Sequence, residues 1–144
     1  MYNLVFFFNE HFILSILWIF FLIGSFFLTI KHISFKDKII DNTQAIKLIN
    51  KKNAIIVDTR SKEVFQQGHI VNSINIPLKN IILGKIKEIK DYKSLPIILI
   101  LNEMNECKNC MNELLKHGFN NIFFLKNGIS HWISENLPLT IKNK

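Results

Sequence analysis

The stretch that decides the fold is IIVDTRSKEVFQQGHIVNSINIP, residues 55–77. It opens with a run of β-branched residues that is typical of a buried strand. The polar group Asp58-Thr59-Arg60 stands at the end of that strand, and residues 61–67 carry apolar side chains at the spacing of a helix. A second β-branched run at 73–76 ends at Pro77. A strand, a helix and a second strand in this order predict two parallel strands of one sheet.

The chain continues this alternation on both sides of the deciding stretch. Apolar and β-branched runs predict strands at 54–58, 73–76, 96–101 and 121–125. Helical spacing predicts helices at 43–50, 61–67, 78–89, 106–117 and 129–135. The predicted fold class is therefore α/β, with a mostly parallel sheet covered by helices on both faces. In such folds the chemistry lies at the carboxyl ends of the strands.

An uncharged run of 19 residues, 12–30, precedes this domain. At about 1.5 Å per residue, a helix of that length covers roughly the 30 Å hydrocarbon core of a bilayer. We therefore expect a transmembrane helix at 12–30 after a short N-terminal tail at 1–11. A cleaved signal peptide is not expected, because residues 1–11 contain no Lys or Arg and no Ala-x-Ala site follows. A buried core helix is not expected either, since the run is apolar on every side.

Lysines next to the apolar run predict its orientation. Lys31, Lys36 and Lys38 follow the run, whereas the tail before it has no Lys or Arg. Because basic residues beside a span favour the cytoplasmic side, we expect a single-pass protein of the bacterial inner membrane with its N-terminus outside. The segment 31–41 is then a polar juxtamembrane linker, and residues 42–141 form a cytoplasmic domain.

The charge of the chain is concentrated after the apolar run. All 18 Lys and Arg lie after residue 30, together with ten of the 11 acids. Such an excess of positive charge suits an anionic partner, either lipid headgroups or nucleic acid. The basic residues are spread among Ile and Asn, and no basic stripe is interleaved with aromatic residues, so nucleic acid is not expected. The expected partners are membrane lipid, through residues 12–30, and another membrane or membrane-associated protein.

The deciding stretch resembles the signature of the rhodanese-like domain family. The matching features are a hydrophobic strand, Asp-x-Arg, an acidic and an aromatic residue, Gly-His-Ile and Ser-Ile-Asn-Ile-Pro. The resemblance covers roughly residues 40–140 and implies a rhodanese-like α/β/α sandwich with a parallel sheet of about five strands. With the leading apolar helix, the layout is similar to small inner-membrane members of the family. The matching family positions are Asp58, Arg60, Gly68, His69, Pro77, Gly118, Gly128 and Trp132.

These family positions also have a structural interpretation. Asp58 and Arg60 flank a strand end, where an ion pair is favoured over a catalytic role. Gly68 suits a turn with positive φ, and His69 beside it suits a hydrogen-bonded turn or core position. Trp132 suits the core. We therefore expect these residues to support the fold and to say little about chemistry.

Active rhodaneses resemble one another in placing a nucleophilic cysteine directly after the fourth strand. Backbone N–H groups of the next loop and a helix N-terminus hold the persulfide anion there. In this chain that position is Leu101, both by counting along the strand and by counting back the family's usual 17 residues from Gly118. The next five residues contain Glu103 and Glu106 and neither Gly nor Arg. These acids would repel an anion, or they are simply solvated at a helix start; in both cases the anion cradle is absent and no catalytic residue is expected.

The two cysteines, Cys107 and Cys110, lie three residues apart at the start of a predicted helix. A Cys-x-x-Cys pair at such a place can serve a redox reaction or half of a zinc site. His117 is too far along the helix to complete a metal site, so neither a metal nor a cofactor is expected. The sequence favours a membrane-anchored rhodanese-like binding module without sulfurtransferase activity. The alternative is a sulfurtransferase or persulfide carrier that uses Cys107.

Overall fold

The computed structural model describes residues 10–141, without the side chains of residues 28–35 and of Met104. The chain divides into two compact units, one ending at Asp37 and the other beginning at Lys38. The expected tail at 1–11 lies almost wholly outside the described residues. Lys31 and the last residues of the apolar run at 28–30 are among those whose side chains are not described.

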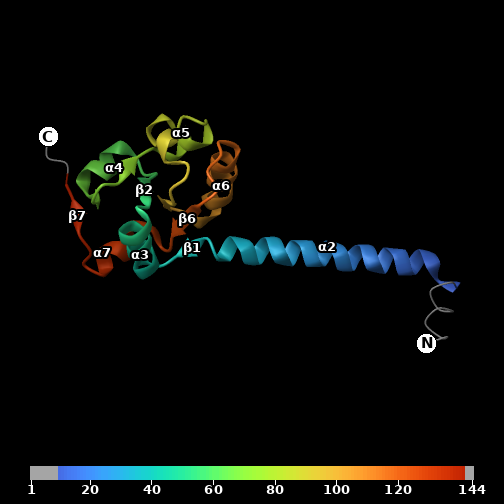
Figure 1. The fold of residues 1–144 in the computed structure, drawn as a ribbon. Helices are drawn as coiled ribbons and strands as arrows, with labels where there is room; N and C mark the ends of the chain where they lie inside the picture. Colours follow the sequence, from blue (N-terminus) through green and yellow to red (C-terminus); the bar gives the residue numbers. More distant parts are fainter. Residues whose placement is uncertain (1–9, 142–144) are drawn as a thin grey trace. The chain divides into compact units, whose positions relative to one another are not determined.

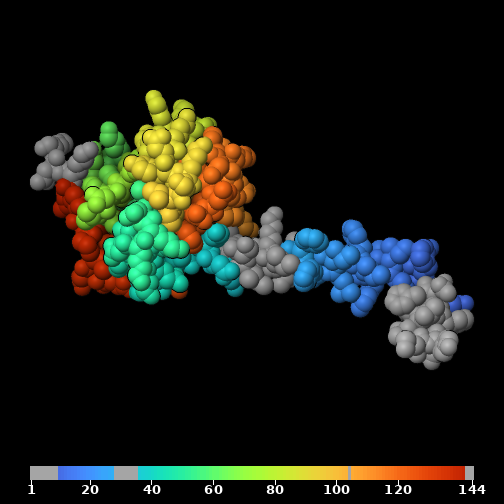
Figure 2. Space-filling view, in the orientation of Figure 1, coloured from blue at the N-terminus to red at the C-terminus, as the bar shows by residue number. Residues whose placement is uncertain are grey.

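The first unit is one long helix, α2, Phe12–Lys36. Between Phe12 and Phe27 every large apolar side chain is exposed, from 47% at Ile19 to 82% at Ile13. These side chains form the blue part of the surface in Figure 2. Over the residues that are described, no helix combines the length and the apolar character needed to cross a bilayer. The transmembrane helix expected at 12–30 is therefore not found in the described part of the chain.

The second unit is built on a five-stranded sheet in the order β1-β6-β5-β2-β4. Every pair of neighbouring strands is parallel, which confirms the predicted parallel α/β fold. The strand at the centre is β5, so the predicted strand at 96–101 is neither at an edge nor helical. A separate two-stranded antiparallel sheet pairs β3 with β7. The strands are β1 Ile39–Ile40, β2 Ile55–Asp58, β3 His69–Ile70, β4 Ile74–Asn75, β5 Ile97–Ile100, β6 Ile122–Leu125 and β7 Leu139–Thr140.

Helices cover both faces of this sheet. Figure 1 shows α3 and α7 on one side and α5 and α6 on the other. Successive side chains of a strand point to opposite faces of the sheet. Ile98 belongs to the core cluster that contains Trp132 of α7. Its neighbour Leu99 points to the other face and is fully buried. The helices are α3 Asn42–Lys52, α4 Lys62–Gln67, α5 Leu78–Ile82, α6 Cys107–Lys116 and α7 Gly128–Ser134, with 3₁₀ turns η1 at Lys87–Tyr92 and η2 at Met104–Glu106.

Two elements differ from the sequence predictions. The single helix expected at 78–89 is wrong, because α5 ends at Ile82 and Gly84 follows with a φ of +70°, a left-handed conformation that stops a helix. The segment expected as a linker at 31–41 contains the end of α2 and the whole of β1. Charged residues, Lys38 and Asp41, flank the two isoleucines of β1, so no strand pattern marks it in the sequence and its pairing with β6 could not be predicted.

Candidate functional site

The carboxyl end of β2 carries a buried ion pair between Asp58 and Arg60. Arg60 Nη2 donates to Asp58 Oδ2 at 2.6 Å, and Arg60 Nε donates to Asp58 Oδ1 at 2.9 Å. The Asp58 side chain is fully buried, and Arg60 is 8% exposed. Arg60 Nη2 also donates to the carbonyl of Gly68 at 2.8 Å, which fixes the end of α4 against the strand. This geometry is that of a structural ion pair whose removal would leave a buried charge.

Two residues that sequence reasoning missed, Thr59 and Asn75, connect the ends of neighbouring strands. The Thr59 backbone N and Oγ1 both donate to the Ile100 carbonyl, at 3.1 and 2.7 Å. Asn75 Nδ2 donates to the carbonyls of Asp58 and Arg60 at 3.1 and 2.9 Å. Short polar side chains at strand ends often bond to nearby backbone, and this was the signal available in the sequence. These bonds connect the carboxyl ends of β2, β4 and β5.

Gly68 and His69 have structural places next to this pair. Gly68 has a φ of 166°, an extended conformation that any residue adopts, so the predicted positive φ is wrong. The reason is that α4 passes directly into β3 without a left-handed turn. The His69 ring stacks on Phe65 with 3.8 Å between ring centroids, and His69 Nδ1 lies 2.9 Å from the Phe65 carbonyl. His69 is thus a hydrogen-bonded core histidine.

Leu101 lies directly after β5, at the carboxyl end of the central strand. Its side chain is 6% exposed. Its carbonyl oxygen contacts Gly128, where an added Cβ would come within 2.7 Å of that oxygen. Gly128 also has a φ of +57°, so both the backbone conformation and the space available require glycine. The position that the resemblance assigns to the family's nucleophile therefore holds a packed apolar residue.

The loop after Leu101 is short and acidic. It forms the 3₁₀ turn η2, in which the backbone N of Glu106 donates to the carbonyl of Glu103 at 3.3 Å. Glu103 Oε2 accepts a hydrogen bond from Asn105 Nδ2 at 3.1 Å. Among its described side chains, the loop has two carboxylates and no Lys or Arg. An anion at this place would meet negative charge, with no cation in the loop to offset it.

Both cysteine side chains are fully buried in the first half of α6. Burial raises the pKa of the Cys107 thiol to about 11, with a smaller contribution from the charge of Glu106. Burial likewise raises the pKa of Cys110 to about 12, helped by Cys107 and Glu106. A thiol reacts and binds metal as the thiolate, so both side chains are chemically quiet at neutral pH. Among the described residues, no group of three or more His, Cys, Asp and Glu could hold a metal ion.

The other family positions serve the packing. Trp132 is 3% exposed and donates from Nε1 to the Pro138 carbonyl at 3.2 Å. Gly118 follows α6 with a φ of +88°, and Pro77 precedes α5 as its N-cap residue. No described contact brings these three residues to the loop after β5.

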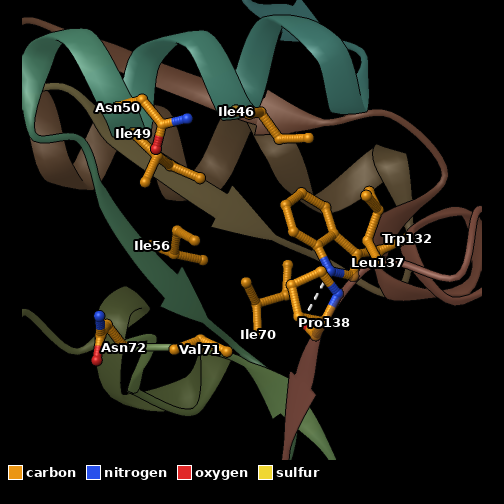
Figure 3. Close-up of a pocket in the computed structure, with 10 residues that line it drawn as sticks. All are labelled: Ile46, Ile49, Asn50, Ile56, Ile70, Val71, Asn72, Trp132, Leu137 and Pro138. Atoms are coloured by element: carbon orange, nitrogen blue, oxygen red, sulfur yellow. Dashed lines mark hydrogen bonds between the residues drawn. The ribbon is translucent and has the colours of Figure 1, made fainter.

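Trp132 also lines an apolar pocket of about 370 Å³ on the α3 and α7 side of the sheet. Figure 3 shows its walls, with the isoleucines of α3 above and the Trp132 ring and Pro138 on one side. No described acidic, basic or histidine side chain lines it, so it can hold an apolar group and offers no acid or base. Sequence reasoning missed this pocket because its walls come from distant segments. They are Ile46, Ile49, Asn50, Ile56, Ile70, Val71, Asn72, Trp132, Leu137 and Pro138.

The family model of the rhodanese-like domain matches residues 41–135. The chain belongs to the rhodanese-like domain family. This assignment confirms the resemblance of the deciding stretch. Thiosulfate sulfurtransferases are among the proteins similar to this rhodanese-like chain.

The relatives of this rhodanese-like chain include small bacterial proteins of the same length. An uncharacterized protein of Buchnera aphidicola subsp. Acyrthosiphon pisum is 49% identical over 144 residues, which is 100% of both chains. The uncharacterized protein YibN of Escherichia coli K12 is 38% identical over 92% of this chain and 93% of its own. The crystal structure of a rhodanese-related protein from Thermoplasma volcanium has a TM-score of 0.60 at 24% identity, covering 73% of this chain and 99% of that one. This last similarity supports the fold.

Proposed function

We propose that this chain is a rhodanese-like binding module that is attached to the bacterial inner membrane and has no sulfurtransferase activity. One observation carries the proposal: the central strand β5 ends in Leu101, a buried residue without a nucleophilic atom. Sulfur transfer by this fold needs a thiolate at that strand end. The nearest cysteine in the sequence, Cys107, is fully buried, and the raised pKa of its thiol keeps it protonated at neutral pH.

The charge of the loop supports the same conclusion independently. Anion stabilisation in enzymes depends on preorganised donors aimed at the charge. Here Glu103 and Glu106 place carboxylates next to Leu101, and the backbone N of Glu106 is already bonded to the carbonyl of Glu103. A domain with neither the nucleophile nor the anion site retains its fold and its surfaces, so binding is the function left to it.

Exposed apolar surface on α2 supports attachment to a membrane. Large contiguous apolar surface in water marks a site that another apolar phase or protein covers. The exposed side chains between Phe12 and Phe27 form such a surface, and residues 12–30 carry no charge. Lys31, Lys36 and Lys38 follow in the sequence and favour a cytoplasmic position for the rhodanese-like domain, with the N-terminus outside. Membrane lipid and another membrane or membrane-associated protein are the proposed partners.

A sulfurtransferase assay of the full-length chain in detergent tests the catalytic part of the proposal. We expect no thiosulfate:cyanide turnover above background for the wild type, Cys107→Ser or Cys110→Ser. Wild-type turnover that Cys107→Ser abolishes and Cys110→Ser retains would instead make Cys107 a displaced nucleophile, and the chain a sulfurtransferase or persulfide carrier.

A topology reporter tests the membrane part. Alkaline phosphatase is active only outside the cytoplasm, so a fusion after Lys144 should be inactive, and the chain should remain with membranes after a high-salt wash. High phosphatase activity would reverse the proposed orientation. Release of the chain into the soluble fraction would contradict attachment.

A further inference from the structure

The apolar pocket beside Trp132 leaves part of the core cluster on the α3 and α7 side of the sheet uncovered. Ile46 and Ile49 of α3 line it and are only half-buried, as is Leu137 after α7. Figure 3 shows the two isoleucines extending from α3 into the same space as the Trp132 ring. Its volume of about 370 Å³ lies at the lower end of the range of sites for small molecules, and its lining favours an apolar occupant.

An occupant can reach this pocket from outside. Val71, Asn50, Asn72 and Pro138 line it and are all exposed. Trp132 is almost fully buried and forms an inner wall. A chain that entered the pocket would therefore contact the exposed side chains first and would come to lie next to the Trp132 ring.

The surface beside the pocket is basic. The segments that line it, 46–56, 70–72 and 132–138, contain three lysines and one acid, Glu135. Glu135 accepts a hydrogen bond from Asn42 Nδ2 at the start of α3, at 2.8 Å. Lys47 and Lys51 are exposed in the second half of α3, next in sequence to the lining residues Ile46 and Asn50. Their i,i+4 spacing places both ammonium groups on one side of the helix, where they can hold one anion.

The pocket is also close to the apolar helix along the chain. α2 ends at Lys36, and α3 begins at Asn42. Even fully extended, the chain between these two residues spans at most about 20 Å. A domain tethered this closely to a bilayer meets lipid at a high effective concentration.

We propose that this face of the domain binds an anionic phospholipid, with an acyl chain in the apolar pocket and the phosphate held by Lys47 and Lys51. The proposal rests on the membrane attachment proposed above. It accounts for both features of this face, because lysine stems lie along apolar surface while their ammonium groups bind a headgroup. An apolar segment of a protein would fill the pocket but would leave the adjacent lysines without a role.

Tryptophan fluorescence separates lipid binding from attachment. The chain has two tryptophans, Trp18 in α2 and Trp132 in the pocket wall. Trp18→Phe leaves Trp132 as the only reporter, and Trp132→Phe leaves Trp18. The full-length variants are placed in phosphatidylcholine vesicles that contain phosphatidylglycerol with brominated acyl chains, which quench tryptophan at short range. Both tryptophans should be quenched. When the bromine is carried by phosphatidylcholine instead, quenching of Trp132 should fall and quenching of Trp18 should not.

Variants that fill the pocket test where the acyl chain lies. In the Trp18→Phe background, Ile46→Phe and Val71→Phe should each remove most of the quenching of Trp132, because the added ring takes the place of the chain. Ile133→Phe, at an exposed position of α7 outside the lining, is the matched control and should retain the quenching. An unchanged midpoint of thermal unfolding in all three variants would show that the loss is not caused by unfolding.

The lysines are tested in the same background. The double variant Lys47→Gln, Lys51→Gln should raise the mole fraction of phosphatidylglycerol at half-maximal quenching of Trp132 by about fivefold or more, because each lysine near an anionic surface favours binding by about that factor. The double variant Lys87→Gln, Lys90→Gln removes the same charge from exposed positions of η1 and should behave as the wild type does.

Failure of the lipid site and failure of the attachment give different results. Quenching of Trp18 without Trp132 would retain the attachment and overturn the lipid site, whereas quenching of neither would contradict the attachment itself. Quenching of Trp132 that both pocket-filling variants leave unchanged would place the acyl chain outside the pocket. An unchanged response of the Lys47→Gln, Lys51→Gln variant would overturn the headgroup contact. A photocrosslinker at position 71 that captured a protein and no lipid in native membranes would assign the pocket to a protein partner instead.

Discussion

The carboxyl ends of β2 and β5 are neighbours in one sheet and have opposite characters. At the end of β2, the buried Asp58 and Arg60 are joined by charge-assisted hydrogen bonds of 2.6 and 2.9 Å. At the end of β5, Leu101 is apolar and is followed by an exposed acidic turn. The Thr59 hydroxyl joins the two ends through its bond to the Ile100 carbonyl.

This difference separates what the fold needs from what the chemistry needs. The ion pair at the β2 end is buried, so the fold depends on it whether or not the domain reacts with sulfur. The β5 end needs only a side chain that fills its space, and leucine does this. The family signature at residues 55–77 therefore reports the fold, whereas the activity has to be read at one strand end elsewhere.

Among variants that test this difference between the strand ends, Asp58→Ala is expected to change the free energy of unfolding most. The change leaves the Arg60 guanidinium buried without its carboxylate, which should lower the free energy of unfolding by about 3–5 kcal/mol. Urea unfolding of the full-length chain measures it. Lys116→Ala is the control, because its ion pair with Glu113 lies at the surface with Lys116 70% exposed, and its loss should cost at most about 1 kcal/mol. Equal costs for the two variants would contradict the structural role of the β2 end.

Gly128→Ala should have the next largest effect. Its Cβ would lie 2.7 Å from the Leu101 carbonyl oxygen at a φ of +57°, so we expect a loss of about 1–3 kcal/mol in the same unfolding experiment. Gly68→Ala is the matched control at the β2 end. An added Cβ there meets only Leu139 Cδ1 at 4.0 Å, so the change should be within about 0.5 kcal/mol. A larger loss of unfolding free energy for Gly68→Ala than for Gly128→Ala would contradict the requirement for glycine at Gly128.

The buried thiols are expected to have a smaller effect on stability, which appears as the pH rises. The pKa of Cys107 is raised to about 11 and that of Cys110 to about 12, whereas a thiol in the unfolded chain has a pKa of about 8.5. The native state thus holds more protons than the unfolded state above pH 8.5, and this stabilisation is complete below that pH and is lost as the pH rises towards 11. Wild type should lose stability over this range more steeply than a Cys107→Ala, Cys110→Ala double variant. Parallel pH profiles would mean that the thiols are not held protonated.

The smallest change of all is expected from Leu101→Cys, and it concerns sulfurtransferase activity. It restores a thiol at the end of β5, yet Glu103 and Glu106 still disfavour the bound anion, so turnover of thiosulfate should stay near background. A second variant that also replaces residues 102–106 with glycines and one arginine should turn over faster than Leu101→Cys. If Leu101→Cys alone gives robust turnover, the acidic loop is compatible with the anion, and the contrast between the two strand ends rests on one residue.

The sequence alone predicted the α/β class, four of the five parallel strands and the family. The four-residue strands β2, β5 and β6 and the motif at 55–77, which contains β4, leave strong local patterns. It also placed Leu101 at the strand end from spacing. It could not predict β1, whose two residues gain their strand conformation only by pairing with β6. The break at Gly84 was equally hidden, since the apolar spacing on both sides of it continues a helical pattern.

What only the tertiary structure decided is the environment of each side chain. The sequence left Cys107 as a candidate nucleophile, and the packing of α6 on the sheet buries it and raises the pKa of its thiol. Gly128 was a family position with no assigned contact until folding brought it against the Leu101 carbonyl. The apolar pocket joins residues from segments that are distant in the chain, from Ile46 of α3 to Pro138 after α7. Local patterns encode which elements form, whereas burial, close contacts and cavities depend on elements that meet only after the chain has folded.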